Sequence, residues 1–99
     1  MVIDDIKYEI FCTQEYVDSL KENIQRLKKA EKYFDKMQQS KNEHKENYYY
    51  EYTKLYLEPG ENLDNFIEIR KQYEDAYVNR KAKINNLYDE IKRIKKLKI

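Results

Sequence analysis

Residues 6–34 read IKYEIFCTQEYVDSLKENIQRLKKAEKYF, and apolar side chains recur along this stretch in alternating steps of four and three residues. The apolar members of the series are Ile6, Ile10, Val17, Leu20, Ile24, Leu27 and Phe34. Thr13 and Glu31 occupy the two remaining places. This is the spacing of a heptad repeat, which puts one apolar line along a helix that lies against another helix. The stretch therefore predicts an all-α fold built from long, packed helices.

The rest of the chain allows helix almost everywhere. The only glycine and the only proline, Gly60 and Pro59, are adjacent, and both residue types disfavour helix interiors. We therefore expect a helix over about 4–57, a turn over 58–61 and a second helix over about 62–98, as one domain spanning 1–99. The expected fold is a long antiparallel helical hairpin or coiled coil. The second helix carries a matching line: Phe66, Arg70, Tyr73, Tyr77, Arg80, Ile84, Leu87, Ile91 and Ile94.

Two stretches leave alternatives open. Residues 38–47 contain no apolar side chain, but none of these residues breaks a helix strongly, so we favour a continuous first helix. If the helix breaks there, the fold has three helices with a short one in the middle. Residues 5–11 alternate between polar and apolar, as a strand would, but their isoleucines also fit the helical line, and we favour helix.

The hairpin geometry predicts that the first helix is longer than the second. A turn at 58–61 would pair the second helix with the first from about Leu20 onward, and would leave Ile6, Ile10 and Val17 without cover. A bare apolar stripe favours another helix as its cover. We therefore expect self-association, as a homodimer, through Ile6, Ile10 and Val17.

Charge is unevenly distributed, although the whole chain carries only +1. Residues 1–19 and 58–78 each carry −4, residues 20–39 carry +3 and residues 79–99 carry +6. The hairpin would place the two basic segments side by side and create an end of about +9. Such an end favours an anionic partner, so nucleic acid is the alternative partner. The residues expected to contact it are Lys28, Lys29, Lys32, Lys92, Arg93, Lys95 and Lys96.

Residues 48–57 read YYYEYTKLYL and form a tyrosine-rich cluster. Tyr48, Tyr52 and Leu55 continue the apolar line, and we expect them to form an aromatic core at the hairpin tip together with Tyr73 and Tyr77. Tyrosine supplies contact area at low entropic cost in recognition surfaces. The tyrosines left over as exposed, partner-binding candidates are Tyr49, Tyr50 and Tyr56.

No pattern indicates catalysis, a metal or a cofactor. His44 is the only histidine and Cys12 the only cysteine, whereas such sites need several convergent groups. We expect His44 to be solvated and Cys12 to be a small buried or half-buried side chain. Glycine-rich phosphate-binding loops are also lacking. We therefore expect no enzyme activity, no cofactor and no small-molecule substrate.

The sequence also bears on the cellular setting. It has no run of about 18 apolar residues that would predict a membrane span, and its first residues lack the basic start and apolar core of a signal peptide. A single cysteine cannot form a disulfide within the chain, so a reducing, cytoplasmic setting is expected.

Together these features predict a non-enzymatic helical protein–protein interaction module that self-associates. The uncovered apolar stripe and the exposed tyrosines indicate an adaptor or a small phage or mobile-element inhibitor. The bias toward Lys, Asn, Ile, Tyr and Glu is typical of low-GC genomes, bacterial or phage. In outline, a hairpin of this length resembles the small type VII secreted helical proteins. Their turn carries a Trp-x-Gly motif, whereas this chain has no tryptophan and reads Glu58-Pro59-Gly60 at its turn. The resemblance implies a helical hairpin and no particular function.

Overall fold

The computed structural model describes residues 2–97, and within them the chain forms three helices and no strand. The helices are α1 (Val2–Gln39), α2 (Glu43–Leu55) and α3 (Phe66–Leu97). The predicted all-α class is confirmed, and residues 5–11 lie within α1. The molecule is a rod whose principal extents are 70 × 21 × 15 Å.

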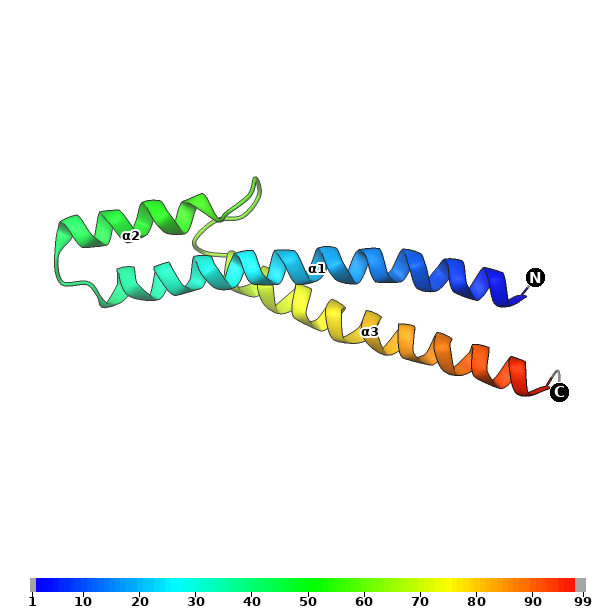
Figure 1. The fold of residues 1–99 in the computed structure, drawn as a ribbon. Helices are drawn as coiled ribbons and strands as arrows, with labels where there is room; N and C mark the ends of the chain where they lie inside the picture. Colours follow the sequence, from blue (N-terminus) through cyan, green and yellow to red (C-terminus); the bar gives the residue numbers. More distant parts are fainter. Residues whose placement is uncertain (1, 98–99) are drawn as a thin grey trace.

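Helix α1 is the axis on which the other two helices pack (Figure 1). After α1 the chain reverses, α2 runs back along the C-terminal part of α1, and α3 continues in the same direction along its N-terminal part. α2 and α3 therefore follow one another along α1, and within residues 2–97 they do not pack on each other. The start of α1 and the end of α3 lie at the same end of the rod.

The first helix ends at Gln39, so the favoured continuous helix over 4–57 is wrong and the three-helix alternative is confirmed. Asn42 is the N-cap of α2, with an extended backbone at φ −112° and ψ 122°. Its side-chain oxygen accepts hydrogen bonds from the backbone N–H groups of His44 (2.9 Å) and Lys45 (3.3 Å). Asparagine is among the best N-caps because it satisfies donors that the helix itself cannot. The break also lets α2 pack against α1, which a straight helix could not do.

Pro59 and Gly60 lie in the connection between α2 and α3. Gly60 has φ 88°, a left-handed backbone conformation that glycine adopts without the penalty of a Cβ atom. The predicted turn at 58–61 therefore falls between two helices, but it redirects the chain from α2 to α3 and does not close a two-helix hairpin. The last helix begins at Phe66, slightly later than predicted.

The apolar line of α1 faces the core, as predicted. Its buried members are Ile6, Ile10, Thr13, Val17, Leu20, Ile24, Leu27 and Ala30. Beyond Leu27 the line moves from Glu31 to Ala30, because a helix of 3.6 residues per turn drifts against a seven-residue repeat. Phe34 is half-buried, and its ring meets that of Phe66 edge-on at 5.5 Å between centroids. Beyond Leu27, too, the apolar line determines which side of α1 the other helices cover.

The register of α3 on α1 differs from the hairpin prediction. Ile6, Ile10 and Val17 form one core cluster with Ile84 and Ile91 of α3. They are at most 7% exposed, so the predicted bare overhang is wrong, and these three residues are covered within their own chain. The physical reason is that the connection after α2 returns the chain to the middle of α1, so α3 is long enough to reach the start of α1.

This register brings oppositely charged segments together. The basic end of α3 lies beside the acidic start of α1, where Lys83 Nζ is 2.9 Å from Glu9 Oε1. Farther along α1, Arg70 Nε lies 2.8 Å from a Glu31 oxygen, and Lys28 Nζ lies 3.7 Å from Glu74 Oε1. The predicted basic end of about +9 is therefore wrong, because each basic segment lies beside an acidic segment.

Candidate protein-interaction surface

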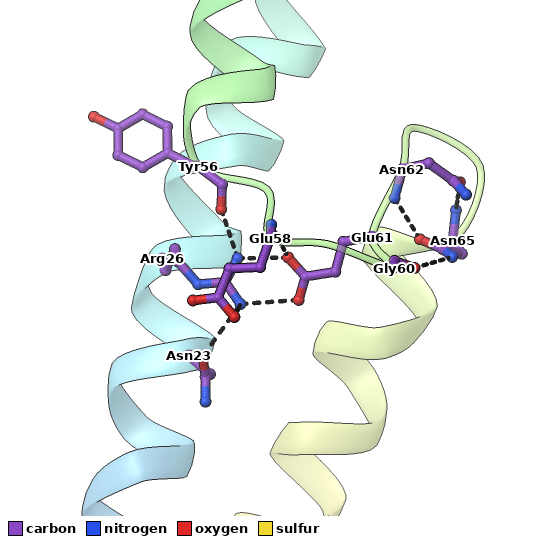
Figure 2. A network of polar contacts seen from close by, with 8 residues as sticks. All are labelled: Asn23, Arg26, Tyr56, Glu58, Gly60, Glu61, Asn62 and Asn65. Carbon is purple, nitrogen blue, oxygen red and sulfur yellow. Dashed lines mark hydrogen bonds and ion pairs between the residues drawn. The ribbon is translucent and has the colours of Figure 1, made fainter.

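Arg26 of α1 holds the end of α2 and the following connection in place (Figure 2). Its Nη1 donates hydrogen bonds to the Tyr56 carbonyl oxygen (2.5 Å) and to Glu61 Oε1 (2.6 Å). Its Nη2 donates to Glu61 Oε2 (2.9 Å) and to Asn23 Oδ1 (3.2 Å), and lies 3.6 Å from Glu58 Oε2. A guanidinium that grips both oxygens of one carboxylate makes a strong and directional contact. We call the Arg26–Glu61 pair the clasp.

The clasp is largely removed from water. The side chain of Arg26 is 18% exposed and that of Glu61 is 7% exposed. The hydrogen bonds from Arg26 hold the pKa of Glu61 below its ordinary value of 4.5, and the bonds to Glu61 raise the pKa of Arg26. Both groups therefore keep their charges around neutral pH, and the clasp persists.

Two asparagines shape the connection beyond Glu61. The side-chain oxygen of Asn62 accepts from the backbone N–H groups of Asp64 (2.9 Å) and Asn65 (3.0 Å). Asn65 in turn accepts from the Asn62 N–H (2.8 Å) and donates to the Gly60 carbonyl oxygen (3.1 Å). These bonds satisfy backbone groups just before α3. With the clasp, they set the direction in which α3 leaves toward the start of α1.

Aromatic rings fill the contact between α1 and α2. The ring centroid of Tyr33 on α1 lies 5.1 Å from that of Tyr52 and 5.9 Å from that of Tyr56. Thr53 is fully buried, and its hydroxyl donates to the Tyr49 carbonyl oxygen (2.8 Å). The inner face of α2 therefore consists of Tyr49, Tyr52, Thr53 and Tyr56, which recur at helical spacing.

Three large side chains of α2 are exposed: Tyr48, Tyr50 and Leu55, at 54%, 36% and 75%. Tyr48 and Leu55 are seven residues apart and share one flank of the helix, whereas Tyr50 lies on the opposite flank. Tyr50 is exposed as expected, and its role in partner binding stays a prediction. Tyr49 and Tyr56 are half-buried, against the expectation that they are exposed, because they belong to the inner face. Tyr48 and Leu55, expected in the core, are exposed because α2 starts after a break and has its own helical phase.

The aromatic core expected at a hairpin tip does not form. Tyr73 and Tyr77 of α3 are half-buried, but Tyr73 packs on the cluster around Leu27 and Phe66, whereas Tyr77 packs on the cluster around Val17. Neither ring approaches the outer face of α2, because α2 and α3 lie on successive parts of α1.

A groove of about 450 Å³ opens where α2 meets the connection to α3. It is lined by Tyr50, Lys54, Leu57, Glu58, Pro59, Glu61, Asn62 and Leu63. The groove offers apolar wall from Leu57, Pro59 and Leu63, whereas the carboxylate of Glu61 is already held by Arg26. We call this groove, with Tyr50 on its wall, the tyrosine surface. Chemically, it can receive a protruding side chain of another molecule.

The basic residues expected to bind anions are exposed but do not gather at one place. One group, on the middle of α1, consists of Lys28, Lys29 and Lys32. The other, in the last turns of α3, consists of Lys92, Arg93, Lys95 and Lys96. The first group lies near the beginning of α3, as the ion pair to Glu74 shows, and the second lies beside Ile91, which packs on the start of α1.

The side chains most often used in chemistry are isolated. His44 is exposed in the first turn of α2, as expected. Cys12 is exposed on α1, so the expectation of a buried or half-buried thiol is wrong. Among residues 2–97, no three His, Cys, Asp or Glu side chains come together as a metal site requires.

Within the part of the chain that the structure describes, no helix combines the length and the apolar character needed to cross a membrane.

Sequence reasoning missed the clasp and the groove. A signal for the clasp was present in the opposite net charges of residues 20–39 and 58–78, but the hairpin prediction had not paired these segments. The groove has no signal in the sequence, because it is formed by the path of the connection.

Comparison with known proteins adds no assignment: no family model matches this chain, and neither a curated protein nor a solved structure gives a match.

Proposed function

We propose that this chain is a non-enzymatic protein–protein interaction module, acting as an adaptor or as a small inhibitor. The observation that carries the proposal is the tyrosine surface, where the exposed Tyr50 lines a preformed groove together with Leu57, Pro59 and Leu63. Aromatic side chains at a pocket are enriched among the residues that dominate binding between proteins.

The rigidity of this surface supports the proposal. Helix α2 is capped at its start by Asn42 and held at its end by the clasp, so the tyrosine surface is ordered before any partner arrives. A preorganised surface loses less conformational entropy on binding. Lys54 Nζ also lies 4.8 Å from the centroid of the Tyr50 ring, which restrains that side chain by a cation–π contact.

The test is capture of partners from cells of the native host with the whole chain as bait. The variant Tyr50→Ala/Lys54→Ala removes two exposed side chains that line the groove and leaves the inner face of α2 unchanged. The matched control, Asn47→Ala/Leu55→Ala, changes exposed residues of the same helix that do not line the groove. We expect a protein that the native and control baits retain and whose capture by the Tyr50→Ala/Lys54→Ala variant falls at least tenfold. Equal retention by all three baits would refute the tyrosine surface as the binding site.

Nucleic-acid binding is the second candidate. It is favoured by Lys92, Arg93, Lys95 and Lys96, which are all exposed in the last turns of α3 and take part in no ion pair within the described residues. Binding by such a group would weaken steeply with salt, because each phosphate contact releases counterions. Fluorescence anisotropy with labelled single- and double-stranded DNA and RNA at low salt tests it. A flat titration would remove this candidate.

A further inference from the structure

Two exposed lines of side chains on α1 carry opposite charge at the same spacing. Asp4, Phe11 and Asp18 follow one another every seven residues on the side of α1 away from α3. Phe11 is 59% exposed, so the middle of this line offers an apolar side chain for contact. We call this the acidic line. The second line, which we call the lysine line, consists of Lys7, Gln14 and Lys21, again in steps of seven residues, and all three are exposed.

The lysine line is extended by α3. Lys28 pairs with Glu74, and a groove beside this pair is lined by Lys21 from α1 together with Tyr77 from α3. The two helices are antiparallel and pack by heptads. Each step of seven residues toward the start of α1 therefore matches a step of seven residues toward the end of α3. The residues of α3 that come to lie along this edge are Lys81, Tyr88 and Lys95, opposite Lys21, Gln14 and Lys7.

From the Lys28–Glu74 pair toward the start of α1, this edge of the α1–α3 pair is unusual because it opposes like charges. Flanking positions of packed helices ordinarily carry complementary charges. The other edge follows that rule: Lys83 pairs with Glu9, and Arg80 lies 5.4 Å above the centroid of the Tyr16 ring. Extending the register of the Lys28–Glu74 pair by heptads places Lys21 opposite Lys81, and Lys7 opposite Lys95. Lys81 does rest 5.3 Å from the Tyr77 ring centroid, but the described residues supply no carboxylate to either lysine pair. The edge is thus suited to an anionic occupant with carboxylates about 21 Å apart, the length of fourteen helical residues.

In the acidic line of a second copy of the chain, Asp4 and Asp18 are fourteen residues apart and so have this spacing of about 21 Å. We propose that this chain forms a symmetric dimer in which the acidic line of each copy lies along the lysine line of the other. Asp4 then meets Lys7, Asp18 meets Lys21, and Phe11 meets Gln14 and the ring of Tyr88. Within the monomer Asp18 only accepts a hydrogen bond from Gln14 (2.9 Å), a contact that a lysine can replace or join.

The helical geometry permits both contacts at once. The two lines are three residues apart, which places them about 60° from each other around α1. A twofold axis parallel to the helices brings each line opposite the other line of the partner copy, so that the dimer is closed. Side chains on a helix lean toward its N-terminus, so Lys7 and Lys21 point toward the levels of Asp4 and Asp18 of the second copy. Helix α2 does not obstruct this face, because it covers only the C-terminal part of α1 (Figure 1).

Sedimentation equilibrium of the whole chain at high micromolar concentration tests the dimer. We expect an apparent mass close to twice that of the chain at low salt and a return toward the monomer near 1 M salt, where screening is nearly complete. We expect the variants Asp4→Lys/Asp18→Lys and Lys7→Glu/Lys21→Glu to be monomeric when alone, because each opposes like charges. Mixed in equal amounts, they should form a dimer again. The control Asp75→Lys/Asp89→Lys shifts the net charge by as much as the first variant, on exposed sites of α3, and should still dimerise.

A monomer at all concentrations and salts, or a dimer that the charge reversals leave intact, would overturn the proposal. Circular dichroism of each variant separates loss of association from loss of folding, and restored association in the mixture excludes a folding defect directly. Self-association here rests on the proposed role in protein contacts, but it uses a different surface. Tyr50→Ala/Lys54→Ala should leave the dimer unchanged, so failure of the tyrosine surface and failure of the charged lines are distinguishable.

Discussion

Arg26 and Glu61 lie 35 residues apart in the chain and are joined by two hydrogen bonds of 2.6 and 2.9 Å. This contact ties the middle of α1 to the connection that precedes α3. It therefore fixes where along α1 the last helix begins, and with it which residues of α1 and α3 face each other. The position of the tyrosine surface, and the residues of α3 that lie beside the lysine line, depend on this attachment.

Loss of the clasp should destabilise the fold. We expect Glu61→Ala to lower the free energy of unfolding by about 2–3 kcal/mol, because the poorly exposed Arg26 guanidinium loses its carboxylate. Urea denaturation followed by circular dichroism measures it. The control Glu22→Ala changes an exposed carboxylate of α1 that takes part in no ion pair within the described residues, and should stay within about 0.5 kcal/mol of the native chain. Equal effects of the two substitutions would contradict a stabilising clasp.

The clasp should also make stability depend on pH in the acid range. The pKa of Glu61 is lower in the folded chain than its ordinary value of 4.5. The contribution of the Glu61 carboxylate to the free energy of unfolding is therefore complete at pH values above 4.5. The contribution is lost as the pH falls through the lower, folded pKa. We expect the free-energy difference between the native chain and Glu61→Gln to be constant from neutral pH to about 5 and to shrink below 4.5. A difference that grows on acidification has the opposite sign and would be inconsistent with the clasp.

The cap at Asn42 should stabilise α2 locally. Asn42→Ala removes the acceptor for the N–H groups of His44 and Lys45, and we expect it to destabilise α2 by about 1 kcal/mol. Hydrogen exchange should quicken in α2 and remain unchanged in α3, since the two helices do not pack on each other. Lys41→Ala serves as the neighbouring control. Uniform quickening across all three helices would show that α2 is not a separate unit.

The core beneath the clasp should be sensitive to truncation. Leu27 is fully buried in one cluster with Ala30 and Phe66, so Leu27→Ala should lower the free energy of unfolding by about 2–5 kcal/mol. Val78→Ala, on the exposed side of α3, should change it by less than about 0.5 kcal/mol. Thermal and urea denaturation give both values. A small effect at Leu27 would place this part of α1 outside the core.

The sequence by itself determined the helical class and the buried side of α1. The line from Ile6 to Leu27 is buried as its spacing predicts, because burial along a helix depends on a period that is written in consecutive residues. The turn near Pro59 and Gly60 was equally local, because these residues disfavour helix wherever they stand. The exposure of Tyr50 followed from its place outside the apolar line.

Only the tertiary structure decided where the chain folds back. The polar residues 38–47 fit a solvated helix and a break about equally well, since the Asn42 cap is worth only about 1 kcal/mol. Packing of the tyrosines of α2 on Tyr33 favours the break, and this contact joins residues remote in the chain. The early reversal shortened the path to α3 and moved its register, so Ile6, Ile10 and Val17 became core, and the acidic and basic segments became neighbours. The register between two helices depends on both of them. The apolar line of α1 alone is compatible with several registers of α3.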